Sequence, residues 1–94
     1  MGLTFEWDGR KAAANRRKHG VSFDEAATAV GDPRSVTIAD PAHSDAEDRF
    51  ALLGESIRGR LVVVVHVERG DSIRIISARA ATARERRFHE QNQE

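Results

Sequence analysis

The sequence predicts a small α+β protein with two N-terminal helices, a four-stranded antiparallel sheet and a C-terminal helix. Three observations predict this class. Helix formers and capping residues fill the first third of the chain. Alternating apolar residues separated by turn signals follow, and a second capping pattern begins near the C-terminus. Because short connections join successive strands, we expect antiparallel pairing with helices packed on the sheet.

Each predicted helix has its own start signal, and the three helices are expected over residues 9–19, 22–30 and 82–91. Asp8 caps the first helix, and Gly20 stands where a left-handed residue ends it. Ser22 and Glu25 form a capping box, in which Ser22 caps the second helix and Glu25 reaches back. Thr82 begins the same pattern for the third helix.

Four strands are expected over residues 35–39, 48–56, 60–68 and 72–79. A polar loop over residues 40–47 separates the first two strands, and the turns Arg58-Gly59 and Gly70-Asp71 join the others. The third strand holds four consecutive valines and is apolar on both faces. We therefore expect it at the centre of the sheet, covered on both sides.

Length and composition indicate one domain over residues 1–94. The absence of cysteine excludes a disulfide framework and a cysteine-based zinc site. The longest apolar run, Leu61 to Val65, is far too short to span a membrane. The first residues lack the basic and apolar regions of a secretory signal, so a cytoplasmic protein without a membrane partner is expected.

The formal net charge is zero, but the charges are unevenly distributed. Residues 58–87 carry eight arginines and three acids, whereas residues 32–55 carry six acids and two arginines. Such a chain can present one basic face while staying neutral. Arginine supplies thirteen of the fifteen Lys and Arg residues, and its planar fork suits bidentate contact with phosphate. A GC-rich genome would produce the same bias toward arginine.

Four short motifs occur in series along the chain: Phe5-Glu6-Trp7-Asp8, Asn15-x-x-Lys18-His19-Gly20-Val21-Ser22-Phe23, Arg49-Phe50-x-x-x-Gly54 and Arg74-Ile75-Ile76-Ser77-Ala78-Arg79-x-x-Thr82-x-x-Glu85-Arg86. With this order and spacing the chain resembles the BrnT family of toxins. The resemblance implies a fold related to the RelE-type ribonuclease toxins and cleavage of RNA in the cytoplasm. It also implies a BrnA antitoxin that binds the toxin and represses their shared operon, so operator DNA is reached only through the antitoxin.

RNA can be cleaved without a metal or cofactor, because the ribose 2′-hydroxyl supplies the nucleophile. The protein then needs a base, an acid, and cations that stabilise the crowded phosphorane. Histidine, glutamate and arginine suffice, and the chain is rich in all three. Since it contains no tyrosine, any role of a tyrosine in RelE-type toxins must be absent here or filled by another residue.

The catalytic candidates lie on or beside the strands: Arg79, His66, Glu47 and Arg49. Arg79 ends the last strand and points from a rigid element, or it forms a salt bridge that holds the C-terminal helix, with Glu85 as partner. Arg74 falls on the opposite face unless a bulge intervenes. His66 is a catalyst at the rim of the valine strand or a core histidine. Glu47 and Arg49 share a face as base and phosphate clamp, or they form an exposed ion pair.

The RNA-binding candidates are basic residues near helix ends: Lys18, Arg84, Arg86 and Arg87. The helix dipole and C-cap explain Lys18 and His19 without chemistry, although Lys18 can also reach a phosphate. The three arginines guide RNA, dock an acidic antitoxin segment, or face solvent. Trp7 is expected to anchor the core rather than to stack on a base. The alternative function is a non-catalytic nucleic-acid or protein-binding module that uses the same arginine face.

Overall fold

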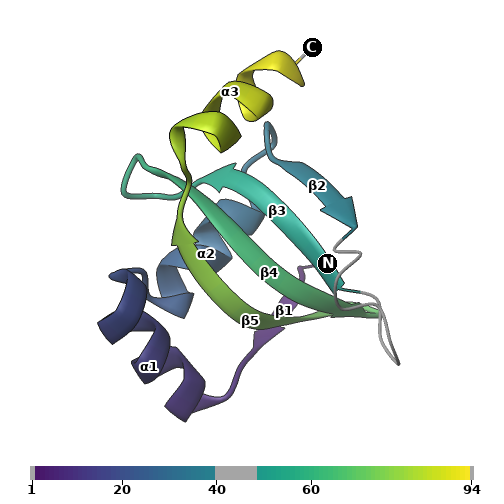
Figure 1. Cartoon of the computed structure of the whole chain (residues 1–94). Helices are drawn as coiled ribbons and strands as arrows, with labels where there is room; N and C mark the ends of the chain where they lie inside the picture. Colours follow the sequence, from purple (N-terminus) through teal and green to yellow (C-terminus); the bar gives the residue numbers. More distant parts are fainter. Residues whose placement is uncertain (1, 40–48, 94) are drawn as a thin grey trace.

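The computed structural model describes residues 2–39 and 49–93 and shows a sheet with helices on both faces (Figure 1). The elements follow the order β1 (Thr4–Glu6), α1 (Gly9–His19), α2 (Phe23–Val30), β2 (Val36–Ala39), β3 (Arg49–Glu55), β4 (Leu61–Arg69), β5 (Ser72–Ala80) and α3 (Ala83–Gln91). None of these three helices has the length and apolar character that a bilayer crossing requires.

The sheet has five strands in the order β1-β5-β4-β3-β2, and it is mixed rather than antiparallel. The expected strands are present and pair antiparallel, with β4 at the centre. The prediction of four strands was wrong because it missed β1, which pairs parallel to β5 through Thr4 and Ser72. A three-residue strand is too short to show alternation, and its partner lies at the far end of the chain.

Local signals predicted most helix and turn boundaries correctly. The Asp8 carboxylate accepts hydrogen bonds from two backbone N–H groups of α1, and Gly20 ends that helix at a φ of 72°. Thr82 starts α3 with a complete capping box. The turns contain Gly59 and Gly70, both with positive φ. Ser22 caps α2 as predicted.

The predicted second half of the α2 capping box was wrong, because Glu25 does not reach back to the helix start. Its carboxylate instead points into the protein and is only 4% exposed. There it accepts hydrogen bonds from Arg60 and Ser56. A buried carboxylate needs such partners, so tertiary contacts prevail over the local capping pattern.

The main core lies between the sheet and the two N-terminal helices. It contains Phe23 and Ala26 of the α2 region, Val62 and Val64 of β4, and Ile75 of β5. Trp7 packs against this core, with its ring 5.9 Å from that of Phe23 in an edge-to-face arrangement, so its predicted role as a core anchor is confirmed. Here "the helical face" means the sheet face covered by α1 and α2.

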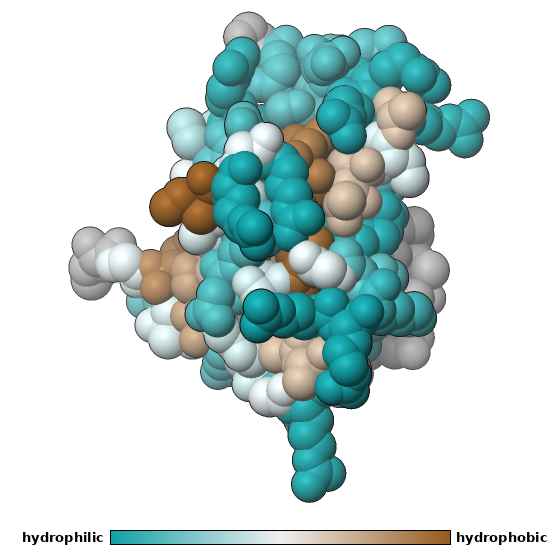
Figure 2. Space-filling model, turned by 90° about the vertical axis from the view of Figure 1, so that its left-hand side faces the viewer, coloured by the Kyte–Doolittle hydropathy of each residue, from teal (hydrophilic) through white to brown (hydrophobic). Residues whose placement is uncertain are grey.

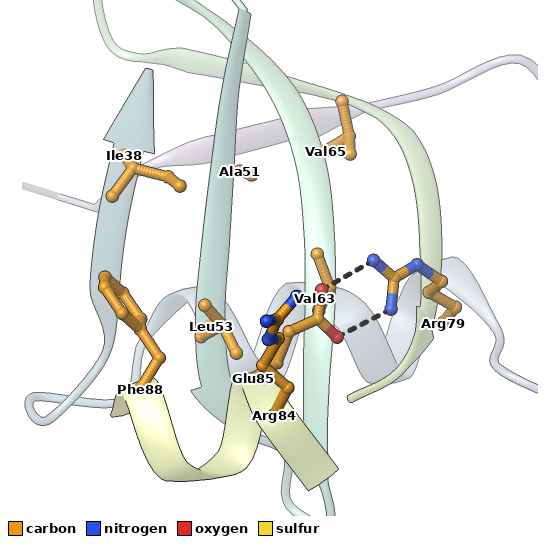
Figure 3. Close-up of a pocket in the computed structure, with 9 residues that line it drawn as sticks. All are labelled: Ile38, Ala51, Leu53, Val63, Val65, Arg79, Arg84, Glu85 and Phe88. Atoms are coloured by element: carbon orange, nitrogen blue, oxygen red, sulfur yellow. Dashed lines mark hydrogen bonds and ion pairs between the residues drawn. The ribbon is translucent and has the colours of Figure 1, made fainter. Parts of the chain in front are cut away.

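The opposite sheet face is only partly covered. Its smaller apolar cluster consists of Leu53, Val63 and Ala81. Helix α3 lies in front of this face (Figure 3), yet none of its residues is buried. This "open face" therefore keeps part of its surface accessible.

A bulge in β5 decides which of its side chains reach the open face. Val65 pairs with Ser77 but His66 pairs with Ile75, so the register shifts by one residue. Alternation is broken there, and Arg74, opposite Val67, falls on the same face as Arg79, opposite Val63. The bulge in β5 therefore places Arg74 and Arg79 on the same face of the sheet.

Candidate active site

A groove of about 410 Å³ runs between the open face and α3 (Figure 3). Strands β2, β3 and β4 supply apolar side chains to its floor, and β5 and α3 supply charged ones to its wall. The lining residues are Ile38, Ala51, Leu53, Val63, Val65, Arg79, Arg84, Glu85 and Phe88. This mixture of apolar floor and convergent charges is typical of a ligand site.

Arg79 projects from β5 into this groove and meets Glu85 of α3 in a bidentate pair. Both N–H···O distances are 2.8 Å (Figure 3). Arg79 also donates to the Ala80 carbonyl at 3.3 Å. A guanidinium has five N–H hydrogens, so in the described part of the chain two of them have no protein acceptor. The predicted salt bridge exists, and Arg79 still keeps donors for a phosphate.

The ion pair shifts the pKa values of both side chains so that Arg79 and Glu85 stay charged. Hydrogen bonding to Arg79 lowers the pKa of Glu85 from 4.5 to about 2, and hydrogen bonding to Glu85 raises the pKa of Arg79. A carboxylate with so low a pKa accepts protons poorly near neutral pH. Glu85 also accepts a hydrogen bond from the Thr82 N–H at 2.9 Å. Its carboxylate therefore holds the Arg79 guanidinium in place through the bidentate pair.

Two further arginines share the open face at the other end of the strands. Arg49 of β3 and Arg74 of β5 both lie opposite Val67, on either side of it. Arg74 approaches Glu6 of β1, with 3.5 Å between its Nη1 and the carboxylate oxygen. Arg74 is not among the catalytic residues predicted from the sequence. The signal that could have found it is the adjacent pair Ile75 and Ile76, which breaks the alternation.

His66 is separated from Arg79 by the sheet itself. It lies on the helical face, pairs with Ile75, and is 1% exposed. Its Nε2 is 3.1 Å from a Glu68 oxygen, and its ring stacks on Phe50 at 5.8 Å. The expectation that His66 lies at the rim was wrong, because strand alternation turns it toward the core. The structure does not bring His66 and Arg79 together.

The remaining candidates are dispersed. Lys18 is exposed at the end of α1, on the other side of the molecule from the groove. Arg84 lines the groove, whereas Arg86 and Arg87 are exposed on α3 and do not. Glu47 lies outside the described residues, so its predicted pairing with Arg49 stays a prediction.

The described residues contain no group of three or more His, Cys, Asp or Glu side chains arranged to hold a metal ion. What the open face does offer is positive charge with hydrogen-bond donors, contributed by Arg49, Arg74, Arg79 and Arg84. Guanidinium groups on rigid strands can hold a phosphodiester and stabilise added negative charge on it.

Comparison with known proteins identifies a family and a similar solved structure. The model of the family described as "Ribonuclease toxin, BrnT, of type II toxin-antitoxin system" matches residues 7–85. The crystal structure of the Brucella abortus ribonuclease toxin BrnT is similar, with a TM-score of 0.65 and 22% identity, and the match covers 85% of this chain and 97% of that one. No curated protein matches the sequence. At 22% identity the similarity to the crystal structure supports only the fold. The family model, in contrast, matches most of the chain and therefore establishes the family. The chain therefore belongs to the BrnT family of ribonuclease toxins of type II toxin-antitoxin systems.

Proposed function

We propose that this protein is a metal-independent endoribonuclease toxin whose open sheet face binds the scissile phosphodiester, and that a BrnA-like antitoxin inhibits it in the cytoplasm. One observation carries the site assignment: arginines from β3, β5 and α3 lie on a single face, and two of them, Arg79 and Arg84, line its apolar groove. The family supports the RNA substrate and the antitoxin partner. Operator DNA would be reached only through that antitoxin.

The reaction is a transesterification within the RNA strand. The 2′-oxygen loses its proton and attacks phosphorus, the bond to the 5′-oxygen breaks, and that oxygen takes up a proton. The products are a 2′,3′-cyclic phosphate and a free 5′-hydroxyl. Arg79 would hold a non-bridging phosphate oxygen through the N–H donors that Glu85 leaves free. Further positive charge along the bound RNA would come from Arg84, Arg49 and Arg74.

The test is cleavage of RNA by antitoxin-free protein in the presence of EDTA. We expect cleavage to survive chelation and to fall by a factor on the order of 10²–10³ in Arg79→Ala, the usual loss for one aimed donor. Arg79→Lys should recover part of the rate, because it keeps the charge but not the fork. Arg34→Ala is the matched control, since Arg34 is exposed and does not line the groove.

Three results would contradict the proposal. Cleavage that stops with EDTA and returns with magnesium would reject the metal-independent reaction. Wild-type rates in a folded Arg79→Ala protein would remove the site assignment. RNA binding without any cleavage, weakened by small steps as each surface arginine is removed, would favour the non-catalytic binding module.

A further inference from the structure

Helix α1 carries a dense positive charge that forms no ion pair with the other described residues. Its eleven residues include no Asp or Glu. The α1 basic face is defined here as its five exposed Arg and Lys side chains, namely Arg10, Lys11, Arg16, Arg17 and Lys18. Within residues 2–39 and 49–93, ion pairs are formed by other residues and none by these five.

Helix stability explains three of these five cations. Cations in the last turn interact favourably with the negative end of the helix dipole, which accounts for Arg16, Arg17 and Lys18. Arg10 and Lys11 lie in the first turn, where the dipole disfavours positive charge. The acid that precedes them, Asp8, is engaged with their backbone N–H groups as the N-cap. These two cations therefore weaken the isolated helix, and their charged side chains remain available to an external partner.

The side-chain pattern of α1 favours a phosphate backbone over a protein. Arg10 and Arg17 are seven residues apart, as are Lys11 and Lys18, which places each pair about 10 Å apart along the helix. The exposed apolar residues between them are Ala13 and Ala14, whose side chains are small. A protein interface is usually anchored by buried Trp, Tyr or Arg side chains, and α1 contains no Phe, Tyr or Trp, whereas phosphate binding needs only spaced cations. Hydrophilic side chains dominate the molecular face that includes α1 (Figure 2).

The position of α1 connects this face to the groove. The Asn15 side chain bonds both backbone groups of Ala78, donating to its carbonyl at 2.8 Å and accepting from its N–H at 3.1 Å. The next residue, Arg79, points to the open face. In the described chain β1 covers the outer edge of β5 only from Ser72 to Arg74, so an extended strand can pass from α1 around the Ala78 edge to Arg79.

We propose that the α1 basic face is an anchoring site for the phosphate backbone of RNA, on the segment next to the one held at the open face. This inference rests on the proposed ribonuclease function and adds a second binding region to it. An RNA long enough to pass around the sheet edge contacts both regions, and the protein measures only 32 × 31 × 27 Å.

The test uses the salt dependence of binding to a 2′-O-methyl RNA, which has no free 2′-hydroxyl and cannot be cleaved. The variant Arg10→Gln/Arg17→Gln should bind more weakly, and the slope of log K against log salt should become shallower by about 1.4, or 0.7 per lost phosphate contact. Arg34→Gln/Arg58→Gln removes the same charge elsewhere and should leave the slope nearly unchanged. Glutamine is a good helix former, and circular dichroism checks that both variants fold.

An unchanged slope in Arg10→Gln/Arg17→Gln would overturn the anchor. So would a variant that keeps its RNA affinity but no longer binds a polyglutamate peptide, since α1 would then serve an acidic protein. Cleavage of unmodified RNA in EDTA, measured alongside, separates this inference from the proposed function. If the double variant shows a shallower slope but the wild-type protein does not cleave RNA, the α1 anchoring site stands and the ribonuclease function is rejected. If the wild-type protein cleaves RNA and the slope is unchanged in the double variant, the ribonuclease function stands and the α1 anchoring site is rejected.

Discussion

Substitution of Arg60 by methionine should strongly destabilise the protein, because it leaves a buried carboxylate without its charged partner. Arg60 donates to both oxygens of Glu25, from Nε and Nη2, each at 2.7 Å. Ser56 donates a third hydrogen bond at 2.7 Å. Methionine keeps most of the aliphatic stem of arginine but removes both charged donors.

The size of the effect follows from burial and pKa. The surroundings of Glu25, first of all the Arg60 hydrogen bond, lower its pKa from 4.5 to about 2, which corresponds to about 3 kcal/mol for all of these contacts together. Breaking a fully buried pair costs about 3–5 kcal/mol. Because the Arg60 side chain is 38% exposed, water replaces part of the lost contact. We therefore expect the free energy of unfolding to fall by about 2–3 kcal/mol, and the melting temperature by roughly 10–20 °C.

Urea denaturation at pH 7, followed by the fluorescence of the single tryptophan, Trp7, measures this change. Arg58→Met is the control, because Arg58 is 70% exposed and lies 3.9 Å from Glu25; its loss should cost less than about 1 kcal/mol. Equal effects of the two substitutions, or a loss below about 1 kcal/mol in Arg60→Met, would refute the reasoning.

The pH dependence gives an independent check on the same pair. The pKa of Glu25 is lower in the folded protein than in the unfolded chain, so its stabilising contribution is present above pH 4.5 and is lost as the pH falls toward about 2. The difference in stability between wild type and Arg60→Met should therefore shrink across that window. A difference that stayed constant from pH 7 to pH 2 would show that Glu25 is not the group concerned.

Two more substitutions test close contacts of the fold. Asn15→Ala should lower the free energy of unfolding by about 3 kcal/mol, because it leaves the Val21 carbonyl and both Ala78 backbone groups without their buried partner; an effect no larger than that of the exposed Lys11→Ala would contradict this. Gly54→Ala would place a Cβ 2.5 Å from the Ala29 carbonyl oxygen and should cost about 1–3 kcal/mol. Gly31→Ala is its control, since there the nearest atom is 3.6 Å away, and equal urea midpoints for the two variants would refute the clash.

The site shows where prediction from sequence succeeded and where it failed. The position of Arg79 at the end of a strand, and its alternative role as the partner of Glu85, were both readable from local order and are confirmed. The grouping of Arg79 with His66 was not confirmed, because the two side chains leave the sheet on opposite faces. Arg74 joins the open face only through the β5 bulge, which adjacent isoleucines suggest but do not prove.

The sequence by itself determined the features that neighbouring residues control: the caps formed by Asp8, Ser22 and Thr82, the glycine turns, and the four longer strands. These features depend on hydrogen bonds and side-chain periodicity over a few positions. Only the tertiary structure decided the parallel pairing of β1, the inward turn of Glu25, and the shared face of Arg49 and Arg74. The physical reason is that each depends on partners far away in the chain, such as Glu25 and Arg60, 35 residues apart.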